Sequence, residues 1–437
     1  MKTVNIGLIG FGTVGSGTAE VLLQQAKRLQ SRAGCIFALK TVVDISSPGL
    51  PEQFAGVKLT KDVNEIFNDP EIDIVVELIG GIEPAKTFVL QAIASGKHVV
   101  TANKALISQH GKEIFDAAAA KNVEVGFEAS VGGGIPLIKA LKEGLVANRI
   151  ESVMGIMNGT ANYILSQMTD YGKDFAEVLK DAQEKGFAEA DPTYDVEGID
   201  TAHKLAIIMT MAYGMTISLD DISIEGISSI QPIDISFAKE FGYRIKLLAI
   251  TRNHGDHVEA RVHATMVPES HMLASINGAF NGVHFHGDMV GDVLLYGLGA
   301  GKMPTGSAVV ADIVDIGRNI VNGSVNRVPS LGYQPGEIKP RAITPLEKLH
   351  GSYYFRMSVL DQPGVLAAIS GTLGKYGISI ESVIQKRRHD SGTVPVVIWT
   401  HETDESAVQK ALAEIDAMDF CTDKTVKVRI LEEDSEG

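Results

Sequence analysis

Residues 191–204, which read DPTYDVEGIDTAHK, combine side chains that could bind a cation with one that could transfer a proton. Lys204 follows four carboxylates that fall within ten positions: Asp191, Asp195, Glu197 and Asp200. A carboxylate can receive a substrate ammonium group, and a lysine ammonium can stabilise and protonate an oxygen on which charge develops. The stretch therefore predicts a site for an amino acid, with Lys204 as the proton donor.

The helix expected after this stretch places Asp200 and Lys204 on one face, because residues four apart lie one above the other. A polar, acid-rich loop, GFAEADPTYDVEG, leads directly into the apolar run LAIIMTMA. A buried helix that begins in a polar cleft would hold the lysine in place for proton transfer. The alternative is a helix-terminal acid that forms a weakly stabilising surface ion pair with the lysine.

A second motif, GFGTVG at residues 10–15, follows an apolar run and opens a helical pattern. In that context it is typical of a dinucleotide-binding loop. Gly10 permits a tight turn, Gly12 lets the backbone approach a pyrophosphate, and Gly15 allows close helix–strand packing. The free N–H groups of the helix start favour phosphate. The alternative, a turn without a ligand, gains nothing from three glycines that each cost chain entropy.

Two further residues are candidate cofactor contacts at the carboxyl ends of expected strands. Asp44 ends the second strand, where an acid can hydrogen-bond a ribose 2′-hydroxyl. No arginine follows it in DISSPG, so the sequence favours NAD over NADP. Lys104 follows KHVVTAN at the edge where open α/β sheets bind ligands, and could contact cofactor or substrate oxygen. The alternative for Lys104 is a solvated loop lysine.

Short β-branched runs alternate with helical patterns in the first part of the chain. This alternation predicts an α/β fold with a doubly wound parallel sheet of the Rossmann type. From Gly132 the pattern mixes helices and strands and predicts an α+β domain. A proline-rich stretch then precedes a pattern of strand, helix, two strands, helix and strand. The expected domains are a nucleotide-binding domain at 1–130, a catalytic domain at 131–323, a linker at 324–350 and a βαββαβ module at 351–432.

Composition excludes several classes of function. The chain has 437 residues and a formal net charge of -15, which disfavours binding to nucleic acid or to an anionic membrane. Its 45% hydrophobic content is ordinary for a globular protein. Two distant cysteines, Cys35 and Cys421, cannot build a disulfide framework, and the start lacks a signal-peptide pattern. We therefore expect a cytoplasmic protein.

The uninterrupted stretch of residues 182–204, AQEKGFAEADPTYDVEGIDTAHK, resembles the signature of homoserine dehydrogenases. Five further motifs resemble that family in the same order, and the resemblance covers about residues 3–320. These motifs are GFGTVG, TANK, GFEASVGGGIP, NGTANYIL and GAGKMPTGSAVVAD. The tail, with VLDQPGVLAAISGTLGKYGISIESV, resembles an ACT regulatory domain. Because no aspartate-kinase segment precedes the motifs, the chain resembles the monofunctional form.

The resemblance implies reversible conversion of L-aspartate 4-semialdehyde and L-homoserine with NAD or NADP. It implies that Lys204 donates the proton and that Lys104 lies near cofactor and reacting centre. The residues implied to hold the amino acid and orient Lys204 are Glu189, Asp195 and Asp200. The residues implied to meet the dinucleotide, besides the glycines above, are Phe11, Thr13, Val14, Gly186 and Gly301, and Gly186 would also approach the substrate. The implied ligands of a sodium-type cation are Glu128, Val131, Gly133 and Ile135.

The ACT resemblance suggests a regulatory site for L-threonine in the DQPGVL turn, with Asp361, Gly364 and Val365 as candidate contacts. The alternative is a module that only dimerises. We expect a homo-oligomer, a dimer or a tetramer. Two other functions remain as alternatives, another Rossmann oxidoreductase that acts on a small amino acid and a non-catalytic NAD-binding sensor. The sensor would have no need of Lys104 and Lys204.

Overall fold

The structure is a computed structural model that describes residues 1–334, 336–385 and 392–432. Pro335, in the predicted linker, and residues 386–391, in the predicted ACT domain, lie outside the described residues. The chain divides into two compact units, each described by itself below. The first unit contains residues 1–153, 201–222 and 280–341, and the second contains 154–200, 223–279 and 342–437.

A parallel six-stranded sheet forms the centre of the first unit, with the strand order β3-β2-β1-β4-β5-β6. This order confirms the predicted doubly wound sheet, in which ligands bind at the carboxyl ends of the strands. The strands are β1 (Thr3–Ile9), β2 (Ile36–Val43), β3 (Lys58–Thr60), β4 (Ile74–Glu77), β5 (His98–Thr101) and β6 (Val125–Gly126).

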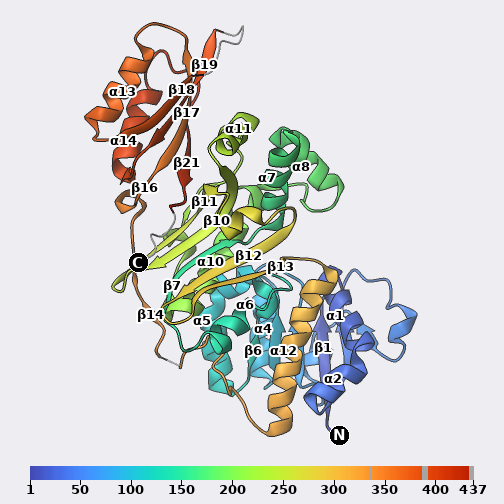
Figure 1. Ribbon diagram of the computed structural model, residues 1–437. Coiled ribbons are helices and arrows are strands. Elements are labelled where there is room, and N and C mark those ends of the chain that lie inside the picture. The colour runs from blue at the N-terminus through green and yellow to red at the C-terminus, as the bar shows by residue number, and fades with distance from the viewer. Residues whose placement is uncertain (335, 386–391, 433–437) are drawn as a thin grey trace. The chain divides into compact units, whose positions relative to one another are not determined.

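Helices cover both faces of this sheet (Figure 1). On one face Val89 of α4 and Ile114 of α5 join a buried cluster with Ile9 and Val99. The helices that arise within the first 130 residues are α1 (Thr13–Gln24), α2 (Ala26–Ala33), α3 (Asn64–Phe67), α4 (Ala85–Ala94) and α5 (Lys104–Lys121).

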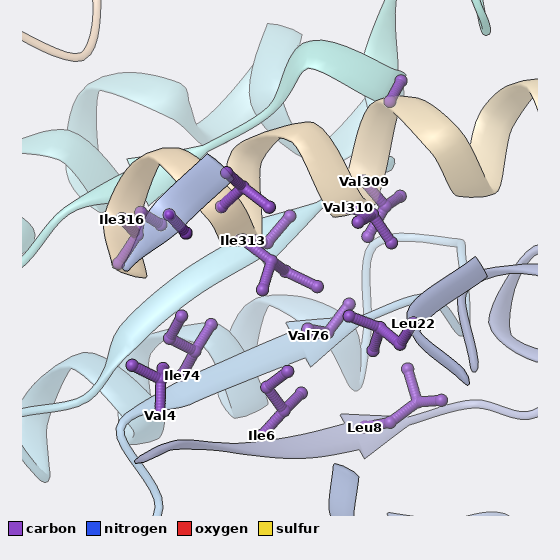
Figure 2. Close-up of a cluster of buried hydrophobic side chains, with 14 of the residues drawn as sticks. Val4, Ile6, Leu8, Leu22, Ile74, Val76, Val309, Val310, Ile313 and Ile316 are labelled. Atoms are coloured by element: carbon purple, nitrogen blue, oxygen red, sulfur yellow. The ribbon is translucent and has the colours of Figure 1, made fainter. Parts of the chain in front are cut away.

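The other face of the sheet packs on a helix from much later in the chain, α12 (Lys302–Asn322). Figure 2 shows Val309 and Ile313 of α12 in one cluster with Leu8 of β1, Val76 of β4 and Leu22 of α1. The predicted boundary at residue 130 does not include this helix, although it completes the hydrophobic core of the sheet. Its apolar side chains bury against strands more than 220 positions earlier in the sequence.

Two glycines allow α1 and α12 to approach closely. A Cβ atom at Gly17 would lie 2.2 Å from the backbone oxygen of Lys302, and one at Gly306 would lie 2.8 Å from the backbone carbon of Gly17. Real Cβ contacts are essentially never this short, so both positions require glycine. The packing brings the first residues of α12 against the second turn of α1.

The elements between β6 and α12 mix helices and strands, as predicted for an α+β domain. The helices are α6 (Leu137–Lys139), α7 (Gly159–Tyr171), α8 (Phe175–Glu184), α9 (Thr193–Val196), α10 (Ile199–Tyr213) and α11 (Pro232–Glu240). The strands are β7 (Ile150–Ile156), β8 (Met215–Thr216), β9 (Ser223–Ile224), β10 (Tyr243–Asn253), β11 (His257–Pro268), β12 (Phe280–Gly287) and β13 (Gly291–Leu298). The long antiparallel pair β10–β11 lies in the sheet of the second unit.

The C-terminal module has the predicted βαββαβ order, with a core that contains Phe355, Ile369 and Ile398. Its elements are β17 (Tyr353–Leu360), α13 (Val365–Lys375), β18 (Ile380–Gln385), β19 (Thr393–Thr400), α14 (Glu405–Asp416) and β21 (Val426–Ile430). Strand β21 also pairs in parallel with β11, where Thr265 opposes Arg429. The module therefore extends the sheet of the second unit.

The segment predicted as a linker contains short pieces of regular structure. Strand β14 (Lys339–Pro340) pairs with β8, and β15 (Ala342–Ile343) pairs with β11. Strands β16 (His350–Gly351) and β20 (Thr403–Asp404) pair beside the ACT core. Sequence periodicity does not reveal two-residue strands, because such a strand contains one step of alternation.

Among the described residues, no helix is both long enough and apolar enough to cross a membrane.

We predict that Gly17→Ala destabilises the protein by about 1–3 kcal/mol, because the added methyl group overpacks the contact between α1 and α12. The matched control is Gly371→Ala in α13. Among the described residues, no atom other than those of its own helix or chain neighbours lies within 4 Å of a Cβ at Gly371. Thermal unfolding measures both variants. A control that loses as much stability as Gly17→Ala would contradict the packing argument.

Candidate active site

The GFGTVG loop has the geometry that its glycines predict. Gly10 has a φ of +96°, which favours glycine, and a Cβ at Gly15 would lie only 2.0 Å from the oxygen of Gly10. Gly12 differs, because among the described residues no atom beyond its chain neighbours lies within 4 Å of a Cβ there. The first and last glycines thus shape the loop, while the backbone at Gly12 is open to a ligand.

The loop ends where α1 begins at Thr13, so Thr13 and Val14 form the first turn of the helix. Gly12 is the N-cap and has no side chain to accept hydrogen bonds from this turn. Backbone N–H groups at a helix start attract anions, and the open surface at Gly12 gives a phosphate room to approach. The described residues therefore fit the pyrophosphate of a dinucleotide.

Asp44 lies beside this loop, at the end of β2. One of its carboxylate oxygens accepts a hydrogen bond from the Phe11 amide at 2.7 Å. The other accepts bonds from the Ser46 amide, the Ser46 hydroxyl and the Ser47 amide. Burial opposes ionisation of Asp44, but these hydrogen bonds hold its pKa below the ordinary value. The charged carboxylate anchors the loop, and the oxygen bonded to Phe11 keeps a lone pair that could accept from a ribose hydroxyl.

A buried network joins the carboxyl ends of β4 and β5 and leads to Lys104. The Thr101 hydroxyl donates to Glu77 at 2.7 Å, and the Asn103 side chain donates to the Gly81 oxygen at 2.6 Å. Asn103 is the N-cap of α5, and Lys104 is the first residue of that helix. The network fixes the backbone that carries Lys104 at the edge of the sheet where ligands bind.

One hydrogen bond connects the two helices that carry the predicted lysines. The hydroxyl of Ser108, one turn after Lys104 on α5, lies 2.6 Å from Nδ1 of His203 on α10. Both His203 and Lys204 are buried, with exposed fractions of 3% and 8%. Lys204 is therefore too buried to be the partner in a surface ion pair that the alternative interpretation describes.

Asn158 brings two of the predicted acids together. Its side-chain amide donates to Asp195 at 2.7 Å and to Asp200 at 2.8 Å, while its oxygen accepts from the Ala161 amide and caps α7. Asp200 is 3% exposed and lies one helical turn before Lys204 on α10. The amide thus holds two carboxylates close together, and a pair of carboxylates is a group to which a substrate ammonium could bind.

Tyr194 precedes Asp195 and belongs to the same cluster. Burial, together with the charges of Asp200 and Asp195, raises the pKa of the Tyr194 phenol to about 12. The phenol therefore remains protonated at neutral pH and can donate a hydrogen bond. Sequence reasoning missed Tyr194. The signal that could have identified it is its position between the acids of DPTYD.

The remaining predicted substrate residues lie on the loop after α8. Gly186 and Phe187 are exposed, and the Phe187 carbonyl accepts a hydrogen bond from the Thr160 hydroxyl at 2.6 Å. The Glu189 side chain is exposed, while its carbonyl oxygen accepts from Gln183. The contacts that bring Asp195 and Asp200 together do not include Glu189, so the structure supports its role less directly.

Gly301 is the N-cap of α12 and has a φ of +126°. The loop before it contacts the glycine-rich loop after β6, because a Cβ at Gly133 would lie 2.4 Å from the oxygen of Gly299. The amide of Gly134 also donates to the Leu298 oxygen at 3.1 Å. Since α12 packs on α1, Gly301 lies in the same unit as the dinucleotide loop, at the start of a helix that contacts α1.

The predicted cation ligands lie in the first unit: Glu128, Val131, Gly133 and Ile135. Both oxygens of Glu128 accept backbone hydrogen bonds at 2.9 Å, one from Ile138 and one from Lys139. Burial and the charge of Asp312 raise the pKa of Glu128 to about 7. A bound cation would offset both effects, and oxygen ligands suit a hard cation. The chemistry of these residues therefore fits the predicted ion.

The predicted effector residues follow β17 in the ACT module. The Asp361 amide donates to the Gly392 oxygen, Gly364 is the N-cap of α13 with a φ of +92°, and Val365 begins that helix. Val365 is buried, whereas a Cβ at Gly364 would have no described atom within 4 Å beyond its chain neighbours. The turn thus presents an open backbone at the start of a helix.

A cavity of about 540 Å³ lies between α5, α10 and the segment after α12. Its walls include Phe115, Ile207 and Tyr333, and none of the predicted site residues lines it. The cavity is therefore distinct from the cofactor loop and from the acid cluster.

Comparisons with known proteins agree with this arrangement. Residues 10–128 match the family model of the homoserine dehydrogenase NAD binding domain, residues 136–314 match homoserine dehydrogenase, and residues 353–420 match the ACT domain. A homoserine dehydrogenase of Neisseria gonorrhoeae is 47% identical over 426 residues, which are 98% of each chain. The chain belongs to the homoserine dehydrogenase family.

Further relatives support the same conclusion. The homoserine dehydrogenase of Pseudomonas aeruginosa is 45% identical over 98% of this chain and 99% of its own. The crystal structure of a homoserine dehydrogenase from Thiobacillus denitrificans is 47% identical, with a TM-score of 0.93 over 99% of both chains. The resemblance found in residues 182–204 and the ACT resemblance are thereby confirmed. The protein is an oxidoreductase that interconverts L-homoserine and L-aspartate 4-semialdehyde with a nicotinamide cofactor.

We predict that Gly12→Ala folds normally and raises the KM for the cofactor by about tenfold or more, because the methyl group occupies the surface that the pyrophosphate approaches. Gly15→Ala should instead destabilise the protein, because its methyl group meets the Gly10 oxygen. Gly49→Ala, in an equally open loop, is the matched control. Steady-state kinetics and thermal unfolding separate the outcomes. An unchanged cofactor KM in Gly12→Ala would show that the open surface is not the phosphate site.

Proposed function

We propose that Lys204 is the proton donor of this homoserine dehydrogenase, and that Asp195 and Asp200 bind the amino group of its substrate. The observation that carries the proposal is the Asn158 amide, which joins the two carboxylates at the start of the helix on which Lys204 lies. The substrate would thus be held by its ammonium group one helical turn from the proton donor.

The chemistry requires a positive group beside the reacting oxygen. When bound, the nicotinamide supplies or accepts a hydride at the carbon that carries this oxygen. The Lys204 ammonium stabilises the negative charge that grows on the oxygen and delivers a proton to it, and in the reverse direction its amine accepts the proton. Asp200, on the same face of α10, orients the lysine. Lys104, at the start of α5, would contact cofactor or substrate oxygen.

Cofactor binding would use the open backbone of the GFGTVG loop, with Gly301 and Gly186 as additional contacts. Asp44 would accept a hydrogen bond from the ribose, and the absence of an arginine in DISSPG favours NAD over NADP. Glu189 would contribute to amino-acid binding. A sodium-type cation on Glu128 and on the carbonyl oxygens of its loop would stiffen the backbone beside the cofactor. We further expect a cytoplasmic homo-oligomer, either a dimer or a tetramer.

The ACT module would serve as the regulatory part of the enzyme, with L-threonine as its ligand. Asp361 precedes the start of α13 at Gly364 by three residues in the sequence, and a carboxylate together with an open helix start could receive the ammonium and carboxylate groups of an amino acid. An ACT module that only dimerises is the competing interpretation.

We predict that Lys204→Ala lowers kcat by about 100-fold to 10,000-fold, the range expected for loss of a general acid. Binding of the cofactor, measured by NADH fluorescence, should persist because the phosphate loop is unchanged. The matched control is Lys112→Ala, which removes an exposed lysine of α5 that pairs with Asp116. Turnover of Lys204→Ala similar to that of the control would exclude Lys204 as the proton donor.

We predict that threonine inhibits the wild-type enzyme at millimolar concentrations and that Asp361→Ala raises the inhibitory concentration at least tenfold. Asp423→Ala, an exposed acid elsewhere in the ACT module, serves as the control. Activity is titrated with threonine at fixed substrate. Insensitivity of the wild-type enzyme would favour the purely dimerising module.

A further inference from the structure

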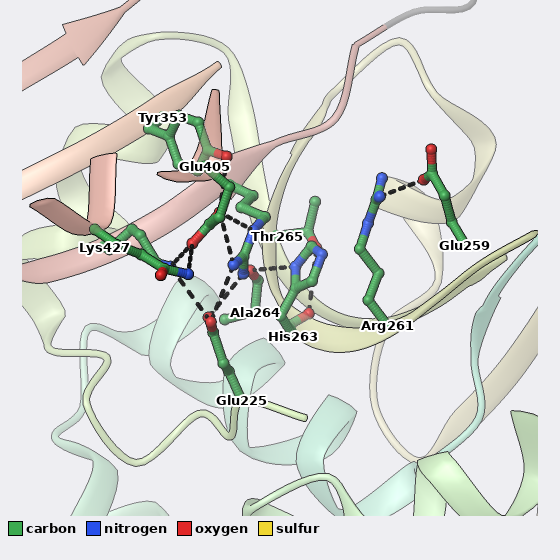
Figure 3. Close-up of polar contacts among 11 residues, drawn as sticks. Glu225, Glu259, Arg261, His263, Ala264, Thr265, Tyr353, Glu405 and Lys427 are labelled. Atoms are coloured by element: carbon green, nitrogen blue, oxygen red, sulfur yellow. Dashed lines mark hydrogen bonds and ion pairs between the residues drawn. The ribbon is translucent and has the colours of Figure 1, made fainter. Parts of the chain in front are cut away.

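Glu225, which follows β9, is held by the last strand of the ACT module. Arg429 on β21 donates to both oxygens of Glu225, at 2.7 and 3.0 Å, and the Lys427 ammonium lies 3.4 Å from one of them. A bidentate pair of guanidinium and carboxylate fixes geometry as well as charge. Figure 3 shows Glu225 below this cluster, facing Lys427 and Glu405.

The rest of the cluster fixes Arg429 within the ACT module. Glu405, the first residue of α14, accepts hydrogen bonds from Arg429 at 2.9 and 3.1 Å and from Tyr353 at 2.7 Å. Glu405 has an exposed side-chain fraction of 0% and Arg429 of 9%, while Glu225 is 36% exposed. Burial acts to raise the pKa of both acids, but Arg429 and Lys427 have the larger combined effect. The pKa of each acid therefore lies below its ordinary value, and both carboxylates stay ionised. The positive charges of Arg429 and Lys427 thus offset the negative charges of Glu225 and Glu405.

On its other side, the segment that follows Glu225 contacts the acid-rich loop of residues 186–198. Its own amide donates to the Val262 oxygen of β11, and two residues later the Ile227 amide donates to the Val196 oxygen at 2.9 Å. Between them, a Cβ at Gly226 would lie 2.6 Å from the same Val196 oxygen. The backbone after Glu225 therefore rests against the residue that follows Asp195.

The acid-rich loop also contacts strand β11 directly. Gly198 has a φ of +81°, and a Cβ there would lie 3.0 Å from a methyl group of Val262. Residues 195–198 are thus confined by the segment that follows Glu225 and by β11. Since Asn158 binds Asp195 and Asp200 on either side of this turn, a shift of Val196 would change the spacing of the two carboxylates.

From these contacts we infer that Glu225 and Arg429 are positioning residues for the substrate-binding acids, and that the ACT module acts on substrate affinity through this pair. The inference rests on the proposed role of Asp195 and Asp200. The connection consists of the ion pair between Arg429 and Glu225, the short backbone segment to Ile227, and the hydrogen bond to Val196. Movement of β21 in the ACT module is thereby transmitted to the amino-acid site.

The test is Glu225→Gln in the full-length enzyme, because glutamine keeps the shape and leaves Arg429 paired with Glu405. We expect the KM for homoserine to rise about fivefold to tenfold, with kcat and the cofactor KM within twofold of wild type. Arg429→Lys, which keeps the charge but loses the bidentate geometry, should shift the same KM in the same direction. Threonine inhibition should weaken in both variants.

The matched control is Glu259→Gln, which removes the carboxylate on β11 that Figure 3 shows paired with Arg261 and that is not part of the connection from Arg429 to Val196 described above. Its homoserine KM should stay within twofold of wild type. A homoserine KM unchanged in Glu225→Gln and Arg429→Lys, or raised equally in the control, overturns the inference.

A double-mutant cycle distinguishes this inference from the proposed substrate role. Asp195→Asn alone should raise the homoserine KM, and an unchanged KM would refute the proposed role of Asp195. In the Asp195→Asn background, Glu225→Gln should raise the KM by a smaller factor than it does in the wild-type background, because one of the two acids that it positions has lost its function. Effects that multiply fully would show that Glu225 acts independently of Asp195 and would refute positioning.

Discussion

The hydrogen bonds of the Asn158 amide to Asp195 and Asp200 are the interaction on which the proposed substrate site depends. Two carboxylates held close together repel each other, and a positive charge beside them offsets that repulsion. In the proposed function the substrate ammonium group supplies such a charge. Because Asp200 lies in the first turn of the helix that carries Lys204, the same contact would set where the proposed proton donor stands relative to the bound amino acid.

The cofactor half follows a different principle, the removal of side chains where backbones must approach. Gly10 and Gly15 shape the phosphate loop, Gly12 leaves it open, and Gly17 lets α12 pack on α1. Charged groups then hold this backbone in place. Asp44 binds the Phe11 amide, and the network between Glu77 and Thr101 supports the start of α5. The two lysines of the proposed mechanism, Lys104 and Lys204, therefore lie on helices whose first turns are fixed by buried polar contacts.

The sequence alone predicts the parts of the structure that local patterns determine. The GFGTVG motif with its alternating runs predicts the parallel sheet, and the tail predicts the βαββαβ module, both of which the structure confirms. The packing of α12 on β1 and β4 could not be predicted, because it joins segments more than 220 residues apart. The pairing of β21 with β11 involves only two described residue pairs, too few for a pattern. Asn158 lies in the motif NGTANYIL, but its two acid partners become evident only in the fold.

The most direct test of the account is a crystal structure of the enzyme with L-homoserine and an oxidised cofactor. The account predicts that the substrate ammonium group lies within about 3 Å of both Asp195 and Asp200, and that Nζ of Lys204 lies within hydrogen-bond distance of the substrate hydroxyl. An ammonium group bound away from both carboxylates would contradict it.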